Sequence, residues 1–139
     1  MPSQKILLIE DDLTLGELLV SLLEQTGHGV TWFVRARIAQ DEFTEDGIVL
    51  MDADGKECKP DFKKFELALI DWRLKGSPIN GPELIPQVVR AGLPVIGISG
   101  LSWLNEELIA VGARAAMVKD ELMTRILRGE LVIEKDFGL

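Results

Sequence analysis

The segment Phe65–Leu74 limits what this chain can fold into more than any other part of the sequence. Its apolar residues 67–70 are followed directly by Asp71. An apolar run of this length is typical of a buried strand in a parallel sheet, and Asp71 stands where that strand would reach the surface. In an open α/β sheet, ligands bind just beyond the carboxyl ends of the strands. We therefore expect Asp71 to be a reactive group.

Short apolar runs alternate with helix-like segments along the rest of the chain. This alternation predicts a parallel sheet with helices on both faces. The expected strands are residues 6–9, 30–34, 67–71, 94–100 and 115–119, and the expected helices are residues 13–26, 36–43, 82–90, 103–111 and 121–127. A further apolar run, residues 131–133, is not assigned to an element.

The boundaries of the first helix are signalled by its flanking residues. Its apolar residues recur with the spacing of an amphipathic helix. Asp12 or Thr14 could cap its start, since Thr14 and Glu17 have the spacing of a capping box. Gly27 is placed to end it.

Residues 44–60 interrupt the alternation before the third strand. Asp54-Gly55 stands there between two short runs, which is a strong hairpin signal. We therefore predict an inserted β-hairpin. Its apolar residues 49–51 either pack on the domain or form a subunit interface in a homodimer, because a two-stranded hairpin is unstable by itself.

Length and charge narrow the class of protein. The chain has 139 residues, the size of one domain, so we expect a single domain over residues 1–139. Its net charge is −8, which argues against binding to nucleic acid or to an anionic membrane surface, because both normally need a basic face. Cys58 is the one cysteine, which excludes an intrachain disulfide. With residues 6–9 too short to span a bilayer and with no signal-peptide pattern, a cytoplasmic protein is expected.

Polar residues follow four of the predicted strands. They are Glu10 and Asp11 after the first, Asp71 after the third, Ser99 after the fourth and Lys119 after the fifth. In a flavodoxin-like order, 2-1-3-4-5, the first and third strands are neighbours and the sheet reverses between them. The acids would meet there and repel one another, and Mg²⁺ is the usual cation for a site of carboxylates and phosphate. Such a set suits phosphoryl transfer to a carboxylate nucleophile.

The chain resembles a response-regulator receiver domain, the phosphoacceptor of two-component signalling, of the chemotaxis-regulator-like, stand-alone kind. The resemblance covers nearly the whole chain, and five segments in order carry it. They are residues 5–12, Leu69-Ile70-Asp71, the helix start at 80–84, residues 94–100 and Val118-Lys119.

The resemblance implies a role for each acid. Asp71 would accept a phosphoryl group from the histidine of a sensor kinase or phosphotransfer protein. Asp11 would bind Mg²⁺ directly, with Glu10 helping through water, and Asp71 and the backbone carbonyl of Arg73 would be further ligands.

The switch residues of the family are only partly present. Ser99 would turn toward the phosphoryl group, Gly100 would leave room for it, and Lys119 would pair with its oxygens. The family's aromatic residue three positions before the lysine is Ala116 here, and its proline after the lysine is Asp120. Phosphorylation is thus expected, with the output by altered binding of a downstream protein partner or by phosphorelay left open.

Simpler interpretations exist for the single residues. The acids of residues 10–12 could only favour a helix dipole, Ser99 could be a helix cap, and Lys119 could be a solvated lysine. Their joint occurrence at strand ends favours the site. Trp72 follows Asp71 in the strand, so its side chain should point to the opposite face.

Two other functions remain as alternatives. The first is a receiver-like interaction or dimerisation module that works without phosphorylation, which Ala116 favours. The second is a hydrolase that uses an aspartyl phosphate, but such enzymes have a second acid where Arg73 stands. We therefore expect a signalling protein that is not an enzyme.

Overall fold

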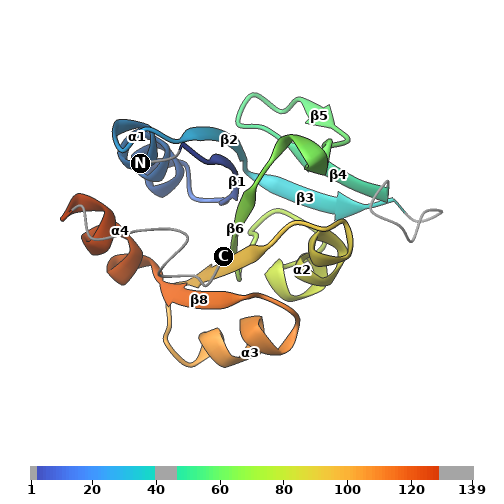
Figure 1. Ribbon diagram of the computed structural model, residues 1–139. Helices are drawn as coiled ribbons and strands as arrows, with labels where there is room; N and C mark the ends of the chain where they lie inside the picture. Colours follow the sequence, from blue (N-terminus) through green and yellow to red (C-terminus); the bar gives the residue numbers. More distant parts are fainter. Residues whose placement is uncertain (1–2, 40–46, 129–139) are drawn as a thin grey trace.

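The main sheet has the five parallel strands that the sequence predicts, in the expected order. The computed structural model describes residues 3–39 and 47–128 (Figure 1). The strand order β2-β1-β6-β7-β8 corresponds to the predicted 2-1-3-4-5. The strands are β1 (Lys5–Ile9), β2 (Gly29–Phe33), β6 (Leu67–Asp71), β7 (Val95–Ser99) and β8 (Ala115–Val118).

Helices cover both faces of this sheet, as expected. On one side α1 (Leu13–Gln25) lies against α4 (Lys119–Leu127), and on the other α2 (Gly81–Arg90) lies against α3 (Leu104–Ala110) (Figure 1). Side chains alternate along each strand, so β1 and β6 feed two separate cores. Leu8 and Leu69 pack with α1 and α4, whereas Leu7 and Ala68 pack with α2 and α3.

The structure decides between the two possible caps of α1. Asp12 is the N-cap, and its Oδ1 accepts a hydrogen bond of 3.0 Å from the Leu15 N–H. Thr14 lies inside the helix. Gly27 follows the C-cap residue Thr26 with a φ of 94°, a left-handed conformation that glycine adopts without strain.

The predicted helix over residues 36–43 is wrong. In its place β3 (Arg35–Ile38) pairs with β4 (Ile48–Met51), and residues 40–46 lie outside the described part. In β3 the buried Ala36 alternates with exposed arginines, which suits an edge strand. The partner strand is ten residues further on, so its influence could not be read from the local pattern.

The predicted insert is correct for the hairpin and incomplete for the sheet. The hairpin joins β4 to β5 (Glu57–Cys58) through a turn in which Asp52 N–H donates to the Lys56 carbonyl at 3.0 Å. Gly55 has a φ of 85° there, as its place in the turn requires. With β3 added, it becomes a three-stranded antiparallel sheet, and residues 44–46 lie outside the described part.

The three-stranded sheet occupies the place of the missing helix. Ile48 and Leu50 are fully buried in the core that α2 and α3 share, so the apolar residues of the insert pack on the domain. Val34 connects the two sheets, because its N–H donates to the Met51 carbonyl at 2.8 Å just after β2 ends.

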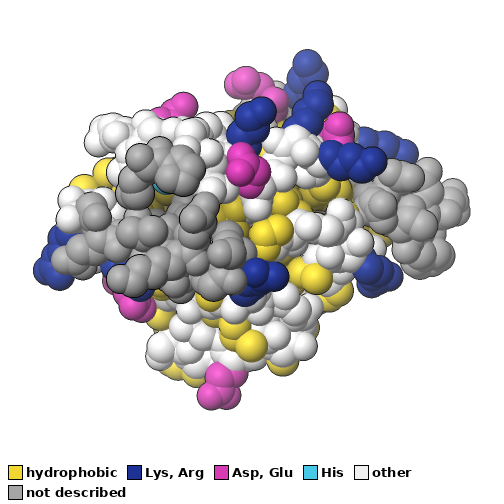
Figure 2. Space-filling view, in the orientation of Figure 1, with side chains coloured by type: hydrophobic (Ala, Val, Ile, Leu, Met, Phe, Trp, Pro, Cys, Tyr) yellow, Lys and Arg dark blue, Asp and Glu magenta, His cyan; other side chains and the backbone are white. Residues whose placement is uncertain are grey.

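On the face in Figure 2, both Lys and Arg side chains and Asp and Glu side chains reach the surface. Among the described residues, no helix has the length and hydropathy to cross a membrane. The apolar run 131–133 lies outside the described residues.

A substitution tests how tightly α1 packs on β2. A Cβ at Gly16 would lie 2.0 Å from Cζ2 of Trp32, so Gly16→Ala must displace the indole. Alanine favours a helix by up to about 1 kcal/mol, but overpacking typically costs about 1–3 kcal/mol. We expect a net loss in the free energy of unfolding, measured by urea denaturation.

Gly29→Ala is the matched control. A Cβ there meets no atom within 4 Å, and Gly29 belongs to the same strand as Trp32. We expect its effect to stay within about 0.5 kcal/mol. Equal losses in the two variants would contradict the role of the indole.

Candidate functional site

Four of the predicted site residues meet at one edge of the main sheet. Glu10 follows β1, and Asp71 ends β6, its neighbour in the sheet. Asp11 comes next after Glu10, and Lys119 begins α4 directly after β8. Parallel strands expose their carboxyl ends on the same side, which is why residues so distant in sequence converge.

Lys119 holds two of these acids through short ion pairs. Its Nζ lies 2.9 Å from Asp71 Oδ2 and 2.9 Å from Glu10 Oε1. The carboxylates are buried, with 2% of the Asp71 side chain and none of the Glu10 side chain exposed, whereas the Lys119 side chain is 20% exposed. Buried carboxylates need such a partner, because removing the ammonium would leave their charge uncompensated.

Asp11 completes the acidic cluster. One carboxylate oxygen from each of Glu10, Asp11 and Asp71 lies within 4.8 Å of the others. Backbone donors orient two of these side chains. Asp12 N–H donates to Glu10 Oε2, and Lys75 N–H donates to Asp11 Oδ2, each at 3.2 Å.

The two buried acids resist ionisation. Burial, together with the charge of Glu10, raises the pKa of Asp71 to about 9, against the opposing effect of Lys119. Burial also raises the pKa of Glu10, although contacts with Asp71 and Lys119 oppose this. The pair therefore retains a proton at neutral pH.

The other two groups favour their charged forms. Burial acts to raise the pKa of Asp11, but hydrogen bonds with Asp71, Glu10 and backbone N–H groups lower it overall. Burial acts to lower the pKa of Lys119, but the carboxylates of Asp71 and Glu10 raise it overall. The ammonium is thus held in place by charge.

These residues fit a divalent cation. Glu10 Oε1 is buried and, apart from its ion pair with Lys119, accepts no hydrogen bond. Three carboxylates face a single ammonium, so the cluster has an excess of negative charge that a hard cation would balance. That the Arg73 carbonyl joins as a ligand stays a prediction.

Ser99 ends β7 with its hydroxyl directed to the start of α3. Its Oγ lies 2.8 Å from the Leu101 carbonyl oxygen and 3.1 Å from Asn105 Oδ1, and the side chain is fully buried. The hydroxyl proton is therefore directed to these two acceptors. A turn toward Asp71 would require Ser99 to leave Asn105.

Trp72 lies on the face opposite Asp71, as its place in the sequence predicts. It packs against the core on the side of α2 and α3, and its Nε1 donates to Glu107 Oε2 at 3.0 Å. Ala116 packs against the same core. Asp71 is thus one peptide bond away from a side chain that is hydrogen-bonded to α3.

Several residues around the site were not singled out by sequence reasoning. Asn105 and Glu107 contact Ser99 and Trp72 from α3, and their distance from the strand ends in sequence gave no signal. Trp32 also contacts this region, because its Nε1 donates to the Glu10 carbonyl at 2.9 Å.

The inserted sheet lines a cavity beside the acids. The cavity has a volume of about 210 Å³ and includes Asp11 and Lys75 in its wall, together with residues 52, 53 and 55 of the β4–β5 turn. The insert therefore shapes access to the site from this side.

Comparison with solved structures supports the fold. No protein-family model matches the chain, and no curated protein matches it by sequence. NtrX from Brucella abortus is similar in structure, with a TM-score of 0.61 and 20% identity over 93% of this chain. This chain covers 27% of the NtrX chain, so it spans about a quarter of that protein's length.

Two other solved structures are similar over more of their length. The receiver domain of the Francisella response regulator 1452 has a TM-score of 0.55 and 17% identity, with 90% of this chain and 94% of that chain covered. A Burkholderia pseudomallei response regulator, solved with a phosphorylated aspartic acid, a calcium ion and citrate, has a TM-score of 0.60 and 18% identity. There the match covers 96% of this chain and 69% of the other. These likenesses show that the chain has the receiver fold.

Asp71→Asn tests whether the buried Asp71 carboxyl, with its raised pKa, lowers the stability of the folded protein. The folded-state pKa of about 9 exceeds the ordinary value of 3.8, so the folded protein keeps a proton that the unfolded chain releases. Stability from this group therefore falls as the pH rises from about 4 to about 9. We expect Asp71→Asn to gain stability relative to wild type over that range, by at least about 1 kcal/mol, in denaturation curves at several pH values.

Asp12→Asn is the control for this measurement. Asp12 is an exposed acid two residues from Glu10, and asparagine caps a helix as well as aspartate does. Its effect on the free energy of unfolding should stay within about 0.5 kcal/mol. A difference between Asp71→Asn and wild type that does not change with pH would show that Asp71 is not the acid described.

Proposed function

We propose that this chain is a response-regulator receiver domain that accepts a phosphoryl group on Asp71. The observation that carries the proposal is Lys119, whose Nζ lies 2.9 Å from both Asp71 Oδ2 and Glu10 Oε1 at the ends of neighbouring strands. With Asp11 in the same cluster, this is the residue set that the receiver family uses for phosphoryl transfer.

The structural likenesses support this proposal. The Burkholderia protein with the same fold was solved with a phosphorylated aspartic acid and a calcium ion. One carboxylate oxygen from each residue of the acidic cluster lies close enough to the others to hold a divalent cation beside Asp71. Together they favour an aspartyl phosphate over a merely structural ion pair.

The chemistry is a direct transfer between two proteins. An oxygen of ionised Asp71 attacks the phosphorus of a phosphohistidine on a sensor kinase or phosphotransfer protein. The O–P bond forms while the P–N bond breaks, and the imidazole leaves with the electron pair and gains a proton from solvent. Lys119 would then move from the carboxylate to the phosphoryl oxygens, since it already holds Asp71 Oδ2.

Glu10, Asp11 and Asp71 would hold Mg²⁺, with the Arg73 carbonyl as a further ligand. When bound, the cation neutralises charge on the carboxylates and on the incoming phosphoryl group. The hydrogen bond from the Lys75 N–H to Asp11 Oδ2 would hold the Asp11 carboxylate in place.

Output would pass through the start of α3. Ser99 can approach the phosphoryl group only by leaving Leu101 and Asn105, which releases that segment. Trp72, the residue after Asp71, is joined to the same helix by its hydrogen bond to Glu107. A downstream protein partner would read this change, and the chain would act in signalling rather than as an enzyme.

A second candidate is an interaction module that needs no phosphate. Ala116 favours it, because the aromatic side chain that moves with the serine in the family is absent at this position. Under this function Asp71 and Lys119 would be a structural ion pair only.

Phosphorylation of Asp71 separates the two candidates. With Mg²⁺ and a small acyl phosphate, we expect an acid-stable, base-labile adduct that mass spectrometry locates on Asp71. The chelator EDTA should prevent its formation. Asp71→Asn should lose it, while Asp61→Asn, an exposed acid that caps a short 3₁₀ turn, should retain it. An unmodified wild-type protein, or an adduct that persists in Asp71→Asn, would contradict the proposal.

Binding of Mg²⁺ should strengthen as the pH rises. The raised pKa of Asp71 means that the cation must displace a proton at neutral pH. The affinity should increase by up to about tenfold per pH unit between about pH 6 and pH 8. Calorimetry in two buffers of different ionisation enthalpy would count the released proton, and an affinity independent of pH would contradict the shared-proton state.

A further inference from the structure

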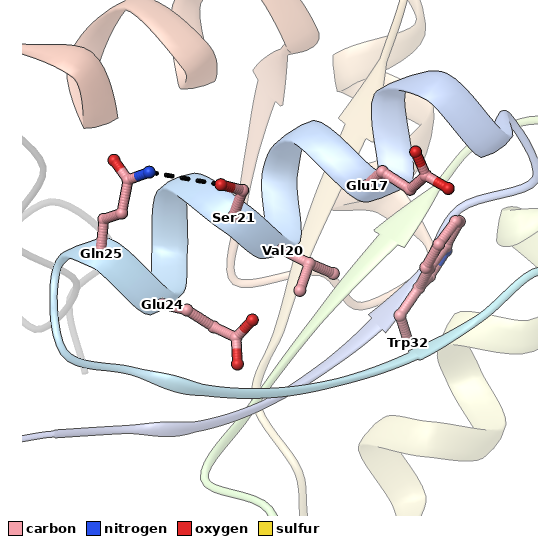
Figure 3. A pocket seen from close by; sticks show the side chains of 6 residues that line it. All are labelled: Glu17, Val20, Ser21, Glu24, Gln25 and Trp32. Carbon is pink, nitrogen blue, oxygen red and sulfur yellow. Dashed lines mark hydrogen bonds between the residues drawn. The ribbon is translucent and has the colours of Figure 1, made fainter.

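Trp32 connects the outer strand of the main sheet to the backbone of the acidic cluster. It lies in β2, and its Nε1 donates to the Glu10 carbonyl at 2.9 Å. In Figure 3 the indole stands beside α1, next to Glu17, at one end of a surface groove between α1 and β2. One face of the indole ring is thus accessible from this groove, whereas the ring N–H is hydrogen-bonded to the Glu10 carbonyl.

The hydrogen bond from Trp32 acts where the strand pairing stops. Glu10 N–H still donates to the Phe33 carbonyl at 3.0 Å, but β1 itself ends at Ile9. The Glu10 carbonyl belongs to the peptide that leads into Asp11. The indole therefore orients the peptide between two of the three clustered acids.

Helix α1 packs closely against the indole. Gly16, in the second turn of α1, leaves space for the ring, since a Cβ there would lie 2.0 to 2.8 Å from three of its atoms. Gly16 N–H in turn donates to the Asp12 carbonyl at 2.8 Å. The turn from Glu10 to Asp12 is thereby held by β2 from one side and by α1 from the other.

We propose that Trp32 is a positioning residue for the metal site, acting through its hydrogen bond to the Glu10 carbonyl. This inference rests on the proposed function, because it assumes that Glu10, Asp11 and Asp71 hold Mg²⁺. A divalent cation of this kind demands near-ideal placement of its ligands. Removing a group that hydrogen-bonds to a metal ligand, without touching the metal, typically lowers metal affinity about 10–100-fold.

Trp32→Phe removes the N–H and keeps an aromatic ring. We expect its affinity for Mg²⁺ to fall about tenfold, in the lower part of that range because the indole orients a backbone peptide. Trp103→Phe is the matched control, since Trp103 is 69% exposed in the loop before α3, and its affinity should equal that of wild type. Titrations followed by amide NMR give the dissociation constants.

A measurement on the wild-type protein covers the case in which Trp32→Phe folds poorly. The three indole N–H resonances are assigned by single Trp→Phe variants or by through-space contacts. We expect the Trp32 resonance to exchange slowly with solvent and to shift during the Mg²⁺ titration, with the same dissociation constant as the Asp11 amide. The Trp103 resonance should stay in place.

The outcomes distinguish this inference from the proposed function. If wild type binds Mg²⁺ while Trp32→Phe binds equally well, or if the Trp32 resonance does not respond, Trp32 is no positioning residue although the metal site stands. If wild type binds no Mg²⁺, or if Asp11→Asn binds Mg²⁺ as well as wild type does, the metal site is absent. Both proposals are then wrong.

Discussion

The Lys119 ammonium, shared between two buried carboxylates, is the interaction on which this site depends. Parallel strands bring Glu10 and Asp71 to the same edge, where their charges would repel each other in a poorly solvated place. Lys119 comes from the far end of the sheet order, and because it is the first residue of α4 its position follows from the packing of that helix. The site is therefore a product of the whole sheet, and it is stable only with a cation or a proton among its acids.

The main sheet and the core of the site could be predicted from the sequence for a physical reason. Buried parallel strands need continuous apolar runs, and those runs end where the chain meets solvent, so Asp71 and Lys119 were visible as polar residues directly after them. Their meeting in space then follows from the strand order alone. The face of Trp72 was equally predictable, because side chains alternate along a strand.

The remaining features depend on contacts that local patterns do not contain. Residues 36–38 looked helical in sequence, and only the pairing with Ile48–Met51 makes them a strand. Ser99 was recognised as a possible donor, but its present partner Asn105 belongs to a helix whose position is set by tertiary packing. Trp32 acts through a backbone carbonyl, which every residue has, so no residue type in the sequence marked that contact.

The three-stranded sheet has a consequence for how copies of this chain meet. A helix hides its backbone hydrogen-bonding groups, whereas a small sheet ends in two strands that can recruit another chain. Here Ser77 Oγ accepts from the Ala36 N–H and so occupies a donor of β3. At the opposite side β5 has only two residues and is flanked by Lys56 on one side and Lys59-Pro60 on the other, features that oppose strand addition. The exchange of a helix for strands thus comes with its own protection against aggregation.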